Sequence, residues 1–91
     1  MADDQHIEHI LERFHERLSE TGLKSTRQRD CIVATFFRVD EHVSVDDLLE
    51  HVRQESPKIG YATVYRTLKL LVEYGFAEPR QFGDGQTRYD P

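Results

Sequence analysis

The residues with the clearest potential for binding chemistry lie in one short stretch, residues 57–72, which contains no carboxylate. Within it, Tyr65 can contact a thymine methyl group and offer its hydroxyl to a base or a phosphate, and Arg66 can donate two hydrogen bonds to guanine or hold a phosphate. Lys69 adds a cation that we expect to reach phosphate, and Ala62 is small enough to permit close approach. A helix in contact with nucleic acid needs this combination of residue types.

Helical spacing brings these four residues to one side of a single helix. At about 3.6 residues per turn, they fall opposite an apolar set that requires a protein core. Lys58 and the backbone N–H groups at the start of this helix also favour an anion. The alternative is an ordinary amphipathic helix whose polar face is simply solvated. The apolar set consists of Val64, Leu68, Leu71 and Val72.

A second basic segment, residues 22–29, contains Lys24, Arg27 and Arg29 close to Thr26, the expected N-cap of another helix. Cations at a helix N-terminus oppose the helix dipole, so a phosphate backbone is one explanation for their presence, and simple tolerance is the other. The whole chain has a formal net charge of −5, which argues against a general nucleic-acid binder. The positive charge is instead concentrated in two acid-free segments that folding could bring to one face.

Composition limits the chain to a small protein domain. Its 91 residues, 37% of them hydrophobic, can bury one modest core, and we expect a single domain over residues 1–91. No apolar run approaches the roughly 20 residues that span a bilayer. The N-terminus lacks the features of a signal peptide, so we expect a cytoplasmic location and no membrane partner. Cys31 is the single cysteine, which excludes an internal disulfide; we expect it to be a small buried side chain.

Apolar periodicity and capping residues predict four helices followed by a hairpin. Residues 76–82 and 86–90 are short, partly alternating segments around a glycine-rich tip at residues 83–85, which predicts the hairpin. Pro79 makes the first strand an edge strand or an interrupted one. The helices are expected at residues 3–20 within an N-terminal segment 1–21, from Thr26 onward, from a capping box at Ser44 to near Gln54, and from near Tyr61 to Gly75.

This order of elements is that of a winged helix-turn-helix, a mainly α fold with a small β-hairpin as the wing at residues 76–91. In such a domain the second helix of the motif enters the major groove of DNA, while the preceding helix and the wing stand over the backbone. The helix that carries Tyr65 and Arg66 occupies the reading position. Double-stranded DNA is therefore the expected partner.

Four stretches of the chain resemble the N-terminal domain of the ferric uptake regulator family. They are GLKSTRQR at residues 22–29, HVSVDDL at 42–48, IGYATVYRTL at 59–68, and the segment that begins with Gly75 and Phe76 and includes the wing. Members of that family are dimeric, metal-sensing bacterial transcription factors, usually repressors. The resemblance implies that Tyr65 and Arg66 read the major groove and that Lys24 reaches a minor groove or the backbone. It also implies that Arg29 and Thr63 contact phosphate.

Candidate metal ligands are few. His6 and His9 could share a metal at i, i+3, but no third ligand is in register, and we interpret them as solvated surface residues. The resemblance implies a regulatory metal whose ligands include His42 and Asp90. An imidazole and a carboxylate suit iron, manganese or zinc, but a site needs four to six ligands. The family's remaining ligands, its Cys-x-x-Cys zinc site and its dimerisation sheet would lie beyond Pro91.

We therefore expect residues 1–91 to be the DNA-binding domain of a metal-dependent transcriptional repressor, with iron as the expected metal. The complete regulator would be a homodimer that binds Fe(II), or Zn(II) or Mn(II). Residues 1–91 alone would be monomeric or weakly self-associating and would not respond to metal. A peroxide-, zinc- or manganese-responsive member of the family is the alternative, and a winged-helix protein-interaction module is another. An enzyme is not expected, because no nucleophile and base occur at a suggestive spacing.

Overall fold

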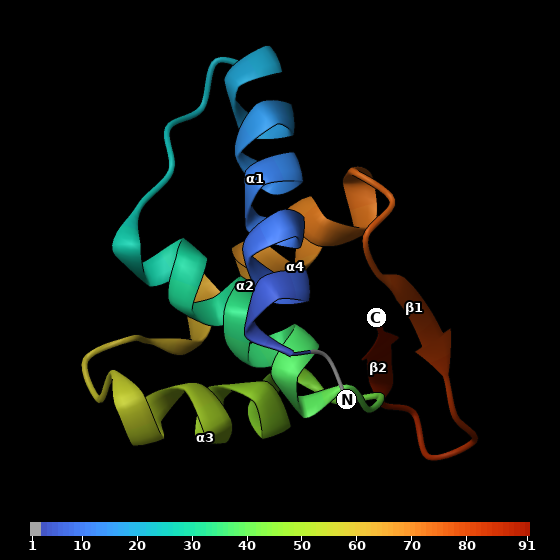
Figure 1. The fold of residues 1–91 in the computed structure, drawn as a ribbon. Coiled ribbons are helices and arrows are strands. Elements are labelled where there is room, and N and C mark those ends of the chain that lie inside the picture. The colour runs from blue at the N-terminus through green and yellow to red at the C-terminus, as the bar shows by residue number, and fades with distance from the viewer. Residues whose placement is uncertain (1–2) are drawn as a thin grey trace.

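Four helices and an antiparallel hairpin make up the fold in the computed structural model, which describes residues 3–91 (Figure 1). This order confirms the predicted class, mainly α with a small β-hairpin. The predicted N-terminal segment includes residues 1 and 2, which lie outside the described residues. The elements are α1 (Asp4–Glu20), α2 (Arg27–Val39), α3 (Val45–Glu55), α4 (Tyr61–Glu73), β1 (Glu78–Gln81) and β2 (Thr87–Asp90).

The ends of the helices lie where the capping residues predict them, to within one or two residues. Asp3 and Thr26 each accept a hydrogen bond from a backbone N–H of the first turn, at 2.8 and 3.0 Å. At the start of α3, the Ser44 hydroxyl accepts from the Asp47 N–H at 3.0 Å and the Asp47 carboxylate accepts from the Ser44 N–H at 3.2 Å, which is the predicted capping box. Gly75 follows α4 with a φ of 83°, the left-handed conformation expected of a residue just past a helix.

The helices enclose one cluster of buried apolar side chains. α1 packs on α2, and α2 packs on both α3 and α4. The ring of Phe14 on α1 is fully buried and lies 6.0 Å from that of Tyr74 and 6.4 Å from that of Phe76. α1 therefore shares its core with the C-terminal end of α4. Most apolar residues of the first three helices are buried, namely Ile7, Ile10, Phe14, Leu18, Ile32, Val33, Phe36, Phe37, Val45, Leu48 and Val52.

Three smaller expectations can be compared directly with the structure. Cys31 is half-buried, not buried as predicted, because it lies at the edge of α2 with its Sγ 3.5 Å from Ser56 Oγ. His6 and His9 are exposed, and residues 3–91 contain no cluster of three His, Cys, Asp or Glu side chains that could hold a metal ion. Within the same residues, none of the helices is both long and apolar enough to cross a bilayer.

The hairpin is tied to the helices through an additional backbone pairing that the sequence did not predict. β1 and β2 are shorter than the predicted segments, and their register places Pro79 opposite Tyr89. Tyr89 directs its own backbone N–H and C=O away from β1, to Val43 in the loop before α3, at 2.8 and 3.1 Å. The position opposite Tyr89 thus needs no N–H donor, which explains why a proline is tolerated on this edge strand.

Candidate nucleic-acid interface

α4 has one buried and one exposed face, as the spacing of its residues predicts. Leu68 lies on the fully buried side, whereas Val72 is only half-buried. Thr67 is also buried, and its hydroxyl donates to the Thr63 carbonyl at 2.8 Å, so its burial leaves no unpaired polar atom. Thr63 itself is half-buried. The exposed face consists of Tyr61, Ala62, Tyr65, Arg66 and Lys69, and it ends at the exposed carboxylate of Glu73 in the last turn.

Two phenol rings stand on the exposed face, one helical turn apart. Tyr61 and Tyr65 keep 50% and 41% of their surface accessible. Among the described residues neither hydroxyl has a hydrogen-bond partner. The Lys69 ammonium lies 5.9 Å from the centroid of the Tyr65 ring, at the limit of a cation–π contact. The face thus presents aromatic surface, free hydroxyl donors and positive charge together.

A groove of about 450 Å³ separates α4 from the hairpin. Tyr61, Tyr65 and Lys69 line it from α4, and Gln81 and Thr87 line it from the two strands. The Gln81 side-chain amide donates to the Thr87 hydroxyl at 2.7 Å, which joins the strands on this side of the wing. Phenol, amide, hydroxyl and ammonium groups are all hydrogen-bond donors, so the lining suits an acceptor-rich ligand such as a sugar–phosphate backbone.

Tyr89 also lines this groove and contributes a third phenol. Burial raises the pKa of the Tyr89 hydroxyl above its ordinary value of 10.0, and the neighbouring phenols of Tyr65 and Tyr61 raise it further. The hydroxyl therefore stays protonated, and able to donate, throughout the physiological range. Among the described residues that line the groove, Asp46 alone carries a carboxylate.

On the opposite flank of α4, a hollow of about 240 Å³ connects this helix to the loop between α1 and α2. Leu23 and Arg29 line it from the loop and from α2, and α4 contributes Arg66, Lys69, Leu70 and the carboxylate of Glu73. The structure therefore brings the two acid-free segments of the sequence to adjacent positions. This is the arrangement that their charge pattern suggested.

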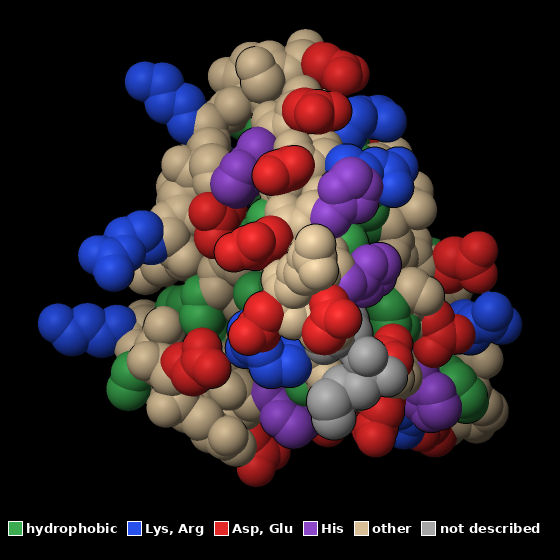
Figure 2. All heavy atoms as spheres, in the orientation of Figure 1, with side chains coloured by type: hydrophobic (Ala, Val, Ile, Leu, Met, Phe, Trp, Pro, Cys, Tyr) green, Lys and Arg blue, Asp and Glu red, His purple; other side chains and the backbone are tan. Residues whose placement is uncertain are grey.

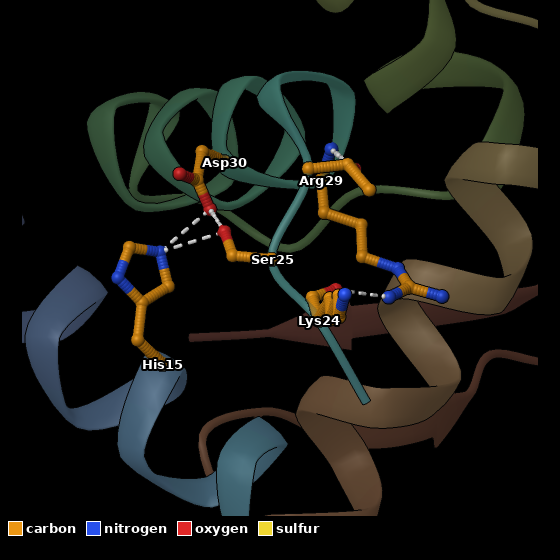
Figure 3. A network of polar contacts seen from close by, with 6 residues as sticks. His15, Lys24, Ser25, Arg29 and Asp30 are labelled. Carbon is orange, nitrogen blue, oxygen red and sulfur yellow. Dashed lines mark hydrogen bonds and ion pairs between the residues drawn. The ribbon is translucent and has the colours of Figure 1, made fainter. Parts of the chain in front are cut away.

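The predicted cations of the basic segment differ in solvent exposure and in hydrogen bonding. Lys24 and Arg27 are exposed, whereas Arg29 is half-buried and its guanidinium donates to the Lys24 carbonyl at 2.8 Å (Figure 3). Lys58 is exposed in the turn before α4. Figure 2 shows acidic and histidine side chains gathered over α1, while several basic side chains project from the edge of the molecule beside it. On this face the basic side chains at the left edge therefore stand apart from the acidic side chains over α1, and other basic side chains lie among the acidic ones.

The N-terminus of α4 is open to a ligand. No side chain caps it, because its N-cap is Gly60. The first N–H groups of a helix have no intrahelical partner, and the helix dipole favours an anion beside them. Ala62 adds little bulk at this point. A phosphate could therefore approach the start of α4 from the exposed side.

The two predicted metal ligands lie next to one another at the base of the wing. His42 Nδ1 is 3.8 Å from Asp90 Oδ1, and Asp90 also pairs with the Arg80 guanidinium from β1. The His42 ring lies 5.0 Å from that of Phe82. Their donor types suit iron, manganese or zinc, but two ligands are too few, and residues 3–91 supply no third within reach.

Sequence reasoning overlooked two residues on this surface. Tyr61 was interpreted only as the start of a helix, although the i, i+4 spacing that placed Lys69 beside Tyr65 also places Tyr61 there. Leu23, 40% exposed, borders the second hollow. Nothing in its local pattern distinguishes it from a core leucine. The remaining candidates are exposed or half-buried as described above, and their roles in DNA contact stay predictions.

Comparison with known proteins gives a consistent result. The family model described as the ferric uptake regulator family matches residues 20–91. The chain is 40% identical over 85 residues to the ferric uptake regulation protein of Bacillus subtilis (strain 168), covering 92% of this chain and 57% of that protein. It is also 32% identical over 82 residues to the peroxide operon regulator of the same organism, covering 90% and 57%.

Among solved structures, the fold resembles that of the ferric uptake regulator Fur from Helicobacter pylori, with a TM-score of 0.83 and 28% identity. The match covers 92% of this chain and 56% of that one. Its structure is described as revealing three functional metal binding sites. The present chain thus spans little more than half the length of each of these three proteins.

Proposed function

We propose, because the chain belongs to the ferric uptake regulator family, that it is the DNA-reading part of a metal-dependent transcriptional repressor that acts in the cytoplasm. The named relatives are regulators, in agreement with the expectation that the chain is not an enzyme. The observation that carries the proposal is the exposed face of α4, which carries no carboxylate from Tyr61 to Val72 and reaches one only at Glu73, in the last turn. Arg66 and the Tyr65 phenol lie on that face, between the wing and the basic loop.

The proposed division of roles follows the positions of the side chains. Tyr65 and Arg66, near the middle of the exposed face, read base edges in the major groove. Lys69, further along α4, holds phosphate. Tyr61 is a further proposed DNA contact, because its side chain is exposed one turn before Tyr65 and lines the groove beside the wing.

The flanking residues would fix the register of the domain on the duplex. Lys24 reaches toward a minor groove or the backbone, and Arg27 and Arg29 contact phosphate beside it. Lys58 and Thr63 do the same at the start of α4, where no side chain caps the helix.

Iron is the proposed regulatory metal, with His42 and Asp90 among its ligands in the complete homodimeric regulator. The named relatives include both a ferric uptake regulation protein and a peroxide operon regulator, so a peroxide-, zinc- or manganese-responsive protein is the alternative. For residues 1–91, where only two ligands are expected, DNA affinity should be the same with EDTA as with added Fe(II), Mn(II) or Zn(II). A metal-dependent affinity in this chain would show that it completes a site without further ligands.

Fluorescence anisotropy with a duplex that the chain itself selects from a random pool tests the proposal. The logarithm of the binding constant should fall linearly with the logarithm of salt concentration, with a slope of about −0.9 for each phosphate neutralised. Arg27→Gln should make that negative slope shallower by about 0.9, because one phosphate contact is lost. The matched control is Arg38→Gln, which removes a cation from the other end of α2, where Arg38 pairs with Glu55 at 3.5 Å; its slope should equal that of the native chain.

The same titration distinguishes the competing function. A protein-interaction module would show no binding at low salt or a slope near zero, and either result would replace the DNA-binding proposal with the docking one. Equal slopes for Arg27→Gln and the native chain would remove Arg27 from the interface but leave the proposal for α4 in place.

A further inference from the structure

The loop between α1 and α2 is held by a three-residue contact that joins both helices to the loop. We propose that this contact, formed by His15, Ser25 and Asp30, positions the loop so that Lys24 is presented to DNA. The inference rests on the proposed DNA-binding function and assigns a role to residues that no DNA contact requires. We refer to the three residues as the loop clamp.

Each of the three residues of the loop clamp contacts the other two (Figure 3). His15 Nε2 lies 2.8 Å from Asp30 Oδ1 and 3.0 Å from Ser25 Oγ, and Ser25 Oγ lies 2.8 Å from the same carboxylate oxygen. A carboxylate can only accept, so the His15 Nε2–H and the Ser25 hydroxyl both donate to Asp30. This arrangement works with the neutral imidazole as well as with the imidazolium, since both can carry the proton on Nε2.

Other residues of the same loop, next to Ser25, are also held by hydrogen bonds to α1 and α2. The Lys24 carbonyl accepts from Arg29 at 2.8 Å, and the Thr26 hydroxyl accepts from the Arg29 N–H at 3.0 Å. At the other end of the loop, the Leu23 N–H donates to the Leu18 carbonyl at 2.9 Å. Successive loop residues are therefore bonded inward.

The side chain of Lys24 is the exception within this loop. It is exposed, and among the described residues it forms no hydrogen bond or ion pair. Figure 3 shows the backbone of Lys24 held by Arg29 while the clamp closes on the next residue, Ser25. If the backbone of one loop residue had to become ordered on binding, the binding constant for DNA would be lower by about tenfold. A loop that is already ordered in the free protein therefore binds more tightly.

His15→Phe breaks the clamp in the proposed test, because it keeps an aromatic ring but removes the donor. We expect DNA affinity to fall by about tenfold, the factor for one loop residue that must be ordered on binding. His15→Gln, whose amide can donate to Asp30, should recover most of the loss. His9→Phe is the matched control: His9 is an exposed histidine of the same helix, outside the clamp, and its replacement should leave affinity unchanged.

A double-mutant cycle with Lys24→Ala separates positioning from general stability. If the clamp acts through Lys24, His15→Phe should change affinity less than twofold when Lys24 is already alanine. An equal loss in both backgrounds, or no loss from His15→Phe in the native background, would overturn the proposal. So would a Lys24→Ala variant with native affinity, because the clamp would then have nothing to present. Absence of DNA binding by the native chain would instead refute the proposed function itself.

Discussion

The two faces of α4 can be tested with substitutions at neighbouring positions, Leu68 and Lys69. Leu68 is fully buried, so Leu68→Ala removes three carbon atoms from the core, which corresponds to about 2.4 kcal/mol at about 0.8 kcal/mol per methylene. The cavity left behind raises the expected loss to about 2–5 kcal/mol. For a domain of this size, 2.5 kcal/mol lowers the midpoint of thermal unfolding by roughly 10–20 °C.

Lys69→Ala is the control, because the side chain is exposed on the opposite face of the same helix. Its stability should stay within about 0.5 kcal/mol of the native chain, while its affinity for DNA should fall. Urea unfolding followed by far-ultraviolet circular dichroism measures the first quantity for both variants. A loss below about 1 kcal/mol for Leu68→Ala, or a larger loss for Lys69→Ala than for Leu68→Ala, would show that the faces of α4 have been assigned the wrong way round.

Three further predictions concern the cap of α3, the groove and the wing. Ser44→Ala removes one half of the capping box and should destabilise the domain by about 0.5–2 kcal/mol in the same urea assay, and a native midpoint would contradict this role. Tyr61→Phe removes a neutral donor, so it should weaken DNA binding without changing the slope against salt, whereas native affinity would exclude Tyr61 from the interface. Because the pKa of Tyr89 is raised in the folded state, its contribution to stability is complete below pH 10.0 and should be lost as pH rises through the folded-state pKa; Tyr89→Phe should lack that part of the alkaline loss.

The helices could be predicted because their signals are local. Asp3, Thr26 and Ser44 each cap the turn that follows them in the sequence, and the apolar stripes repeat at the helical period. Exposure along α4 follows from the same periodicity. The same periodicity also points to Tyr61, which lies one turn before Tyr65 on the stripe that contains Lys69.

Features that depend on distant segments could not be predicted in the same way. The pairing of Val43 with Tyr89 joins the loop before α3 to strand β2, two segments that carry no shared pattern. The loop clamp brings together His15 and Asp30 from two helices, and in sequence each is simply one of many surface polar residues. The proximity of His42 and Asp90 is also long-range, and it was expected only through the family resemblance. Such contacts depend on how the helices pack, which residue spacing alone does not determine.

The central claim, that α4 reads DNA sequence through Arg66, is tested most directly by selecting duplexes from a randomised pool with the native chain and with Arg66→Ala. The native chain should enrich a defined sequence, and Arg66→Ala should lose discrimination at one position, at a cost of about 1–3 kcal/mol on the selected duplex and less on random DNA. An unchanged preference in Arg66→Ala, or no enriched sequence with the native chain, would contradict the claim.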